Sequence, residues 1–506
     1  MKEIPFHESI TPLERVILTF SLVVGVFMAI LDTTIVDIIV PKLTAPLSTD
    51  IYGAQWVITS YMTASAVGIL MVEHLERLLG LKKVFILGLT FFTVASLFCG
   101  QANSLEFMVF WRAVQGLGEA FIVISAESLL FSAYAPEKRG VAMGIYGLGV
   151  SFAPALGPTL GGWLTEHLNW RFVFYINVPI GILNILLTLL FVKEYRTANK
   201  HQPFNVVSFL FLATATVSLL IVLSKGQQLG WFSSDFILWM ACLSTLSFLL
   251  FLLSELSSEH PLVDFSTLKV KEFLVSLFVY CFVLGFSMYQ VFYLIPLYFE
   301  NLKQIGTFQT GLAILPMALT IGMSSPIAGA LADKKSPLIP LSIAIPVYLF
   351  SSLYLIPKAD FYMPTAQTKV YLVILAVGMG FFFAPITLMA LNRVGEEKRT
   401  LAVSFMHYIR FVGGSFGTAM ATNHLQGYMW ENFQRTSEIQ EHFYILEYLK
   451  AVPETIFYNL QVLFAYSNAF KMAFTFAGLW AVPGLLALLL LFKPKSVLSG
   501  LLKVRG

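Results

Sequence analysis

The sequence predicts an all-α membrane protein with fourteen transmembrane helices, and its composition and hydrophobic pattern lead to that fold class. Of the 506 residues, 57% are hydrophobic and only 12% are charged, and the mean hydropathy is +0.77. About a quarter of the residues are charged in typical soluble domains. Apolar runs of about 18 residues recur along the chain, and at about 1.5 Å per residue each can cross a hydrocarbon core of about 30 Å. The composition therefore excludes a soluble globular protein.

The predicted spans are separated by short polar stretches. The first one contains an acidic residue and lacks a small-residue cleavage site, so we interpret it as a retained span and not as a signal peptide. The fourteen spans are expected at 16–40, 54–72, 84–100, 105–132, 140–164, 172–192, 206–223, 236–254, 273–299, 310–332, 337–356, 370–391, 401–423 and 469–492.

The distribution of lysine and arginine predicts the orientation in the membrane. With a cytoplasmic N-terminus, the cytoplasmic loops hold more than twice as many of these residues as the opposite loops, which is the asymmetry that the positive-inside rule requires. An even number of spans then places both termini in the cytoplasm. The formal net charge of +3 and the lack of a basic patch interleaved with aromatic residues predict no nucleic-acid partner.

Two similar basic loops indicate two related halves. The loops at 73–83 and 329–335 occupy matching places if the seventh and eighth spans are an insert. We therefore expect an N-terminal six-helix bundle at 1–200, two inserted helices at 201–265 and a C-terminal six-helix bundle at 266–506. A long extracytoplasmic loop is expected at 425–468, with an amphipathic helix near 438–449 that could lie on the membrane or bind a partner.

Ionisable side chains inside the spans indicate a functional site, because a charge at mid-bilayer costs about 2.5–3.5 kcal/mol on insertion scales. Arg112, Gln115, Glu119 and Glu127 lie on one face of the fourth span. Lipid offers such a face no hydrogen-bond partner, so we expect it to contact protein or a water-filled cavity.

Asp32 and Arg112 are predicted to lie at the same depth. At about 1.5 Å per residue, each lies roughly 10–12 Å below the outer end of its span. A carboxylate that is held by an arginine and exposed alternately to the two sides of a membrane can couple transport to protons. We predict this role for Asp32, Arg112 and Glu119, and a static salt bridge between Asp32 and Arg112 is the alternative.

A substrate cavity is predicted from polar residues of the fourth and thirteenth spans and from an aromatic stripe on the ninth. Aromatic faces bind flat apolar molecules and cations. The alternatives are that the rings pack on lipid or neighbouring helices and that the histidine is hydrogen-bonded for structure. The candidate cavity residues are Gln115, Glu127, Phe286, Tyr289, Gln290, Tyr293, His407 and Arg410.

The fifth span carries small residues at every fourth position, so a neighbouring helix backbone can approach closely. Its prolines favour a bend. We predict a seal or pivot here, and close packing without a further role is the alternative. The residues are Gly149, Ala153, Pro154, Gly157, Pro158, Gly161 and Gly162.

Other kinds of chemistry have little support. The sequence has neither a nucleotide-binding P-loop nor a zinc-protease motif, and its three cysteines lie in apolar runs without C-x-x-C spacing. We predict no metal and no cofactor besides protons. A membrane-embedded transferase is the enzyme alternative, and it would require acids and bases clustered at one membrane interface.

Four motifs in chain order resemble the signatures of the major facilitator superfamily, in particular its fourteen-span drug:proton antiporters of the EmrB/QacA type. The resemblance covers essentially the whole chain and weakens after the sixth span. The motifs are Leu31–Val36 followed by Pro41, then Arg112–Gly116, Ala153–Gly162 and Trp170–Gly181, and the segment Phe405–Thr418 also resembles the family's thirteenth span.

The resemblance implies a major facilitator fold and the export of small hydrophobic compounds in exchange for protons. It associates Asp32 and Arg112 with proton coupling, and it identifies the fifth-span run as the antiporter motif. It also implies a location in the bacterial cytoplasmic (inner) membrane, and it makes a periplasmic adaptor and an outer-membrane channel plausible partners.

The chain departs from the family pattern at several acidic positions. Glu73 and Arg77 replace the usual Gly and Asp of the loop after the second span, whereas the matching loop keeps Gly329 and Asp333, which we predict to form a cytoplasmic gate. Asp37 stands where the family usually has Asn, and Glu119 lies outside the usual span-four pattern. These extra acids would favour cationic substrates or additional protons.

Two alternatives within transport stay open. The chain could export one endogenous metabolite, such as a siderophore or a lipid-like molecule, or it could be a facilitator without proton coupling. Competition between substrates would test the first alternative, and a requirement for a pH gradient would test the second.

Overall fold

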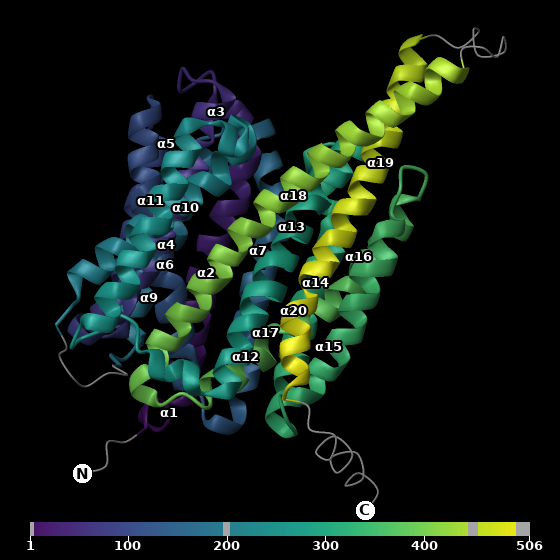
Figure 1. Cartoon of the computed structure of the whole chain (residues 1–506). Coiled ribbons are helices and arrows are strands. Elements are labelled where there is room, and N and C mark those ends of the chain that lie inside the picture. The colour runs from purple at the N-terminus through teal and green to yellow at the C-terminus, as the bar shows by residue number, and fades with distance from the viewer. Residues whose placement is uncertain (1–4, 196–202, 444–453, 492–506) are drawn as a thin grey trace, which may run out of the picture.

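A computed structural model describes residues 5–195, 203–443 and 454–491 of the chain. These residues fold into two helical bundles and a helical pair beside them (Figure 1). The short helix α1 (Phe6–Ser9) and the C-terminal end of α20 (Val482–Leu489) lie at one end of the molecule, which we call the α1 end. The opposite end, which holds the short helix α3 (Ile51–Ala54), is called the α3 end.

In the described residues, the N-terminal bundle has six long helices and the short helix α8, in addition to α1 and α3. Caps in the sequence fix several of its helix starts: Thr11 and Glu14 exchange hydrogen bonds in a capping box at the start of α2, and Ser104 Oγ accepts a hydrogen bond from the Phe107 amide at the start of α6. The helices are α2 (Pro12–Leu43), α4 (Trp56–Leu79), α5 (Leu81–Gly100), α6 (Leu105–Ala133), α7 (Arg139–His167), α8 (Phe172–Tyr175) and α9 (Asn177–Phe191).

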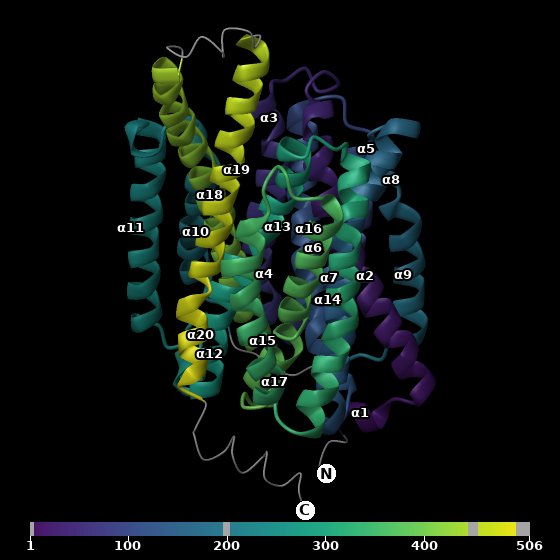
Figure 2. The same ribbon diagram turned by 90° about the vertical axis from the view of Figure 1, so that its right-hand side faces the viewer.

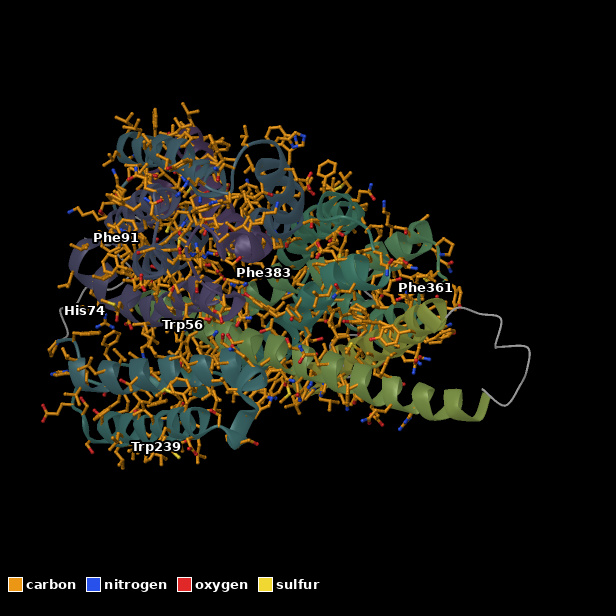
Figure 3. The ribbon with its side chains drawn as sticks, turned by 90° about the horizontal axis from the view of Figure 1, so that it is seen from above. Trp56, His74, Phe91, Trp239, Phe361 and Phe383 are labelled. Atoms are coloured by element: carbon orange, nitrogen blue, oxygen red, sulfur yellow. The ribbon has the colours of Figure 1, made fainter. Side chains whose placement is uncertain are left out.

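The insert is a hairpin of α10 (Val206–Leu229) and α11 (Asp235–Ser257). Gly230 has a φ of 76° and closes the end of α10, a conformation that glycine adopts without strain. The outer helix exposes large apolar side chains; Trp239, which is 72% exposed, lies on the side away from both bundles (Figure 3). Such a face requires lipid rather than water as its solvent.

The C-terminal bundle has more interrupted helices than the N-terminal one. Its first span, Lys271–Leu302, passes through π-helical turns at Tyr280–Ser287 and Tyr298–Leu302; such turns frequently occur at functional sites. The α-helices are α12 (Lys271–Val279), α13 (Met288–Leu297), α14 (Thr307–Lys334), α15 (Leu338–Phe350), α16 (Thr365–Gly380), α17 (Phe383–Leu391), α18 (Arg399–Phe443), α19 (Glu454–Trp480) and α20.

The expected number of fourteen spans is not confirmed. Among the described residues, twelve helical segments are long and apolar enough to cross a membrane, and a thirteenth is obtained if the bent pair Pro136–Pro154 and Thr159–His167 counts as one span. The predicted span at 401–423 is helical and lies within α18. It carries polar residues such as His407 and Arg410, so composition alone does not identify it as a span.

The expected long loop at 425–468 is largely helical in the structure. Helix α18 continues to Phe443 and α19 begins at Glu454, and the two form a long antiparallel pair that rises beyond the other helices at the α3 end (Figure 2). A helix of 45 residues is about 68 Å long at 1.5 Å per residue, so α18 is longer than a bilayer is thick. Part of the predicted amphipathic helix at 438–449 lies outside the described residues.

The two bundles meet along two seams. Helix α7 packs against α14 at one seam, and α4 packs against α18 at the other. Phe383 of α17 lies where the halves meet (Figure 3), with its ring 5.7 Å from that of Tyr146 of α7. Helix α10 of the insert contacts both α4 and α18, so the insert lies along the second seam.

Candidate functional site

A fully buried carboxylate inside the N-terminal bundle is the centre of the candidate site. Asp32 of α2 is 1% exposed. Its Oδ2 accepts a hydrogen bond of 2.5 Å from Arg112 Nη1, and its Oδ1 accepts bonds from Gln115 Nε2 at 3.0 Å and from Asn177 Nδ2 at 2.7 Å. The pairing of Asp32 with Arg112 that their depths predict is therefore present. A buried charge of this kind is tolerated only when it is paired and hydrogen-bonded.

Arg112 is held by more than its ion pair. Its Nε donates to the Val57 carbonyl oxygen at 3.1 Å, and its Nη1 also donates to Gln115 Oε1 at 2.7 Å. The guanidinium lies 4.0 Å from the centroid of the Tyr61 ring, within the range of a cation–π interaction. The planar fork of arginine satisfies these partners together, which a lysine cannot do.

Three members of this site are absent from the sequence-based prediction. Asn177 opens α9 and lies 145 positions from Asp32 in the chain, and Ser96 of α5 accepts a hydrogen bond from Gln115 at 2.7 Å. Tyr61 of α4 is the third. Asn177 lies within the Trp170–Gly181 motif, which is the signal that could have found it. Ser96 and Tyr61 have no such signal, because helix packing alone brings them near.

Glu119 lies about one helical turn beyond Gln115 on α6, beside Tyr61 and Ser65 of α4. Its Oε2 is buried and has no hydrogen-bond partner. An acidic oxygen in this position can take up a proton without first losing a donor.

A second buried polar cluster joins the two bundles. Glu127 of α6 is fully buried, and its Oε2 lies 2.5 Å from His407 Nε2 of α18. Arg410 Nη2 of the same helix lies 2.9 Å from His407 Nδ1. The structure therefore brings together three residues that are predicted as cavity residues, but they contact one another across the seam.

The aromatic stripe of the ninth span packs mainly within the C-terminal bundle. The Phe286 ring stacks on those of Phe416 and Trp480, at 5.6 and 5.1 Å between centroids. Tyr293 Oη accepts a hydrogen bond of 3.0 Å from Thr422. Gln290 is fully buried, and its Nε2 and Oε1 have no partner. Tyr289 faces Gly414 of α18.

Helix α7 presents small residues on two faces. The predicted stripe contacts α2: a Cβ added at Gly149, Gly157 or Gly161 would meet Val23, Thr34 or Ile35 of that helix. Ala153 is fully buried in the same packing layer, and Pro154 is partly buried. The backbone of Pro158 is helical, and its side chain lies outside the described residues.

A second glycine face of α7, which the sequence analysis does not predict, contacts α14 across the seam. A Cβ at Gly140 would lie 2.3 Å from the Gly329 carbonyl oxygen, and one at Gly144 would lie 2.4 Å from Pro326 Cα. At Gly162, near the other end of α7, the nearest atom would be 3.6 Å away, in Phe308. The two helices therefore approach closely at Gly140 and Gly144, and also where Gly311 of α14 faces Thr159 of α7.

Polar contacts between the halves gather at the α1 end. Asp333 of α14 accepts hydrogen bonds from the amides of Gly140 and Val141, at 2.7 and 2.9 Å, and so caps the N-terminus of α7, where a negative charge is favoured. Arg399 of α18 donates to Ser132 Oγ of α6 at 2.8 Å. Gly329 and Asp333, the predicted gate, therefore contact the opposite bundle.

The matching residues of the N-terminal bundle behave differently. Glu73 and Arg77 form a salt bridge with each other within α4. Among the described residues, no group of three His, Cys, Asp or Glu side chains is placed to hold a metal ion.

Comparisons with known proteins agree with this architecture. A sequence model described as "Major Facilitator Superfamily" matches residues 22–418. The chain is 29% identical over 426 residues to "Multidrug export protein EmrB" of Haemophilus influenzae, which covers 84% of this chain and 82% of the relative. It is also 29% identical over 443 residues to "Fatty acid resistance protein FarB" of Neisseria gonorrhoeae, covering 86% and 85% of the two chains.

Solved structures show the same fold at low sequence identity. The human organic anion transporter MFSD10 aligns with a TM-score of 0.59 at 14% identity, over 94% of this chain and all of the other. The proton:xylose symporter XylE aligns with a TM-score of 0.58 at 13% identity, over 92% and 94%.

Proposed function

Because the chain belongs to the major facilitator superfamily, we propose that it is a proton-coupled multidrug efflux transporter that works by alternating access. The buried Asp32 carboxylate carries this proposal. Its donors come from α6 and α9, while α4 and α5 supply the residues that hold those donors. A proton on Asp32 would remove the charge that pairs with Arg112, and this would change the packing of the bundle.

The arrangement in the membrane follows from the same proposal. The first and the last described helices both lie at the α1 end. This arrangement is consistent with an even number of membrane crossings. Counting α7 and α18 as spans gives fourteen, with both termini in the cytoplasm of a bacterial cell and the α1 end facing the cytoplasm. Residues Asp333, Arg399 and His407 then close the cytoplasmic side, so that the structure corresponds to a cytoplasm-closed state.

The transport cycle can be described from these residues. Substrate enters when the cytoplasmic contacts open, and it leaves when they close and the α3 end opens. Asp32 takes up a proton from the outside and delivers it to the cytoplasm in exchange, with Glu119 as a second acid on the same helix face. The aromatic residues of the first C-terminal span and Gln290 supply apolar and polar contacts for hydrophobic compounds.

Two finer points belong to the same proposal. The helical pair of α18 and α19 rises beyond the bundles at the α3 end, and this is where a periplasmic adaptor leading to an outer-membrane channel would bind. The relative named for fatty acid resistance supports a second candidate function, the export of a lipid-like metabolite. Competition between a fatty acid and a cationic dye for transport would separate the two functions.

Dye transport in proteoliposomes tests the central claim. With an imposed pH gradient and a clamped membrane potential, we expect the natural chain to move dye against its gradient, and Asp32→Asn to bind dye but lose the proton-driven movement. Asp235→Asn, the same change at an exposed position at the start of α11, serves as the matched control. Equal proton-driven transport by Asp32→Asn and the natural chain would reduce Asp32 to a static ion-pair partner.

A further inference from the structure

The cluster of Glu127, His407 and Arg410 is separate from the Asp32 site. Glu127 lies fifteen positions after Arg112 on α6, which is about 22 Å along the helix axis. Asp32 and its side-chain partners all belong to the N-terminal bundle, whereas Glu127 contacts α18 of the C-terminal bundle. The Glu127 cluster therefore bridges two bodies that must separate when the cytoplasmic side opens.

The hydrogen bonds fix the protonation state of His407. Arginine has only donors, so Arg410 Nη2 donates to His407 Nδ1, and Nδ1 must carry a lone pair. The ring is then neutral with its hydrogen on Nε2, and Nε2 donates to Glu127 Oε2. The order of charges is a cation at Arg410, a neutral imidazole and an anion at Glu127. His407 cannot take a second proton while Arg410 occupies Nδ1.

The site for an added proton is therefore on Glu127. Its Oε1 is buried and accepts no hydrogen bond in this structure. The other titratable groups around it are Tyr146 of α7 and Tyr280 of the π-helical turn, and Tyr289 lies near Arg410. Glu127 is the carboxylate of the cluster, and its Oε1 is the place where an added proton binds without displacing a donor.

We propose that Glu127 is a second proton-binding site of this transporter and that its protonation releases His407 and Arg410 from α6, which opens the cytoplasmic seam. The proposal rests on the proposed function, because it assumes alternating access. One proton binds one carboxylate oxygen, the carboxylate becomes a neutral acid, and no other covalent bond changes. A hydrogen bond to an ionised group is roughly twice as strong as one between neutral groups, so the link across the seam weakens.

Distance measurements across the cytoplasmic seam test this proposal without any transport step. Nitroxide labels are placed on cysteines at Glu137 and Glu397, which are exposed on opposite bundles at the α1 end, in full-length chain in lipid nanodiscs with the three native cysteines replaced. Double electron–electron resonance measures the distance between the two labels from pH 5 to pH 9. With the natural Glu127, we expect a short distance between the two labels at high pH and a longer one at low pH.

Glu127→Gln, which is permanently neutral and of the same shape, is expected to give the long distance at every pH, so that the pH-dependent shift is lost. Glu106→Gln makes the same change at an exposed position of α6 at the other end and should retain the shift. His407→Asn, which removes the imidazole, is a second variant in case Glu127→Gln does not fold, and it should also favour the long distance.

The outcomes separate this proposal from the proposed function. The proposal is overturned if the distance in Glu127→Gln shifts with pH as much as it does in the natural chain. It is also overturned if the shift is kept in Glu127→Gln but lost in His407→Asn, because the proton would then act on His407. Failure of Asp32→Asn to alter dye transport concerns only the Asp32 site, since the distance measurement uses neither dye nor a pH gradient across a membrane.

Discussion

At the scale of single residues, the chain places ionisable groups where lipid would not tolerate them and then surrounds each with specific partners. Asp32 has three side-chain donors, and Glu127 has one. Asp32 accepts hydrogen bonds on both of its carboxylate oxygens, whereas Oε1 of Glu127 is buried without a donor. The surroundings of each acid, more than its residue type, decide its chemistry.

Arg112 illustrates how specific these surroundings are. Arg112→Lys keeps the charge but loses the Nε bond to Val57 and at least one of the two Nη1 bonds. Because each hydrogen bond to a charged group is worth about 1.5–3 kcal/mol, we expect a lower melting temperature and at least a tenfold loss of proton-driven dye transport. Arg393→Lys, at an exposed arginine, is the control. Transport by Arg112→Lys at the natural rate would mean that only its charge matters.

At the scale of helices, the small residues of α7 form two separate packing faces. Its predicted stripe packs on α2 within the N-terminal bundle, and its other glycines pack on α14 across the seam. The first contact belongs to the interior of a bundle that moves as a body, while the second must be remade whenever the bundles rock. The glycines at Gly140 and Gly144 therefore determine how closely the halves approach at the α1 end.

Gly144→Ala tests this use of α7. Its Cβ would lie 2.4 Å from Pro326 Cα in α14, and a backbone atom cannot yield as a flexible side chain can. Overpacking typically costs about 1–3 kcal/mol, so we expect a lower melting temperature and slower transport. Gly162→Ala on the same helix, where the nearest atom is 3.6 Å away, should be nearly neutral. Equal effects of the two substitutions would show that helix propensity, and not the seam, is responsible.

At the scale of the whole molecule, the insert connects both halves along the second seam. Ser224 of α10 lies 2.9 Å from Thr59 of α4, and Gln227 of α10 donates to Gln426 of α18 at 3.0 Å. Thr216 Oγ1, further along α10, lies 2.7 Å from Tyr408 Oη of α18. Movement of the bundles must break one of these sets of contacts, and the insert then moves with the other half.

A cross-link between α10 and α18 tests this arrangement. Cysteines at Gln227 and Gln426, in a chain without its native cysteines, are joined by a short thiol-specific reagent. Because α10 also contacts α4, we expect the link to restrain the two halves and to reduce dye transport in proteoliposomes severalfold. The two single-cysteine variants treated with the same reagent are the controls. Unchanged transport would show that the insert travels with the C-terminal bundle.

The sequence by itself determines the membrane class, the order of most helices, the polar face of α6 and the pairing of Asp32 with Arg112. These features depend on local composition and on depth along a helix, which residue spacing fixes. The sequence predicts a helix near 438–449 but not the continuous helix through 425–437, because the polar residues there resemble a loop outside the membrane. A helix can continue into water when it packs on a partner such as α19.

Only the tertiary structure decides which faces meet. Asn177 reaches Asp32, Glu127 reaches His407, and the glycines of α7 divide between α2 and α14 because of helix rotation and tilt. Residue spacing gives the positions of side chains on their own helix, but it does not give the angle at which two helices cross. That angle is set by packing over the whole bundle, and it determines which buried charges find partners.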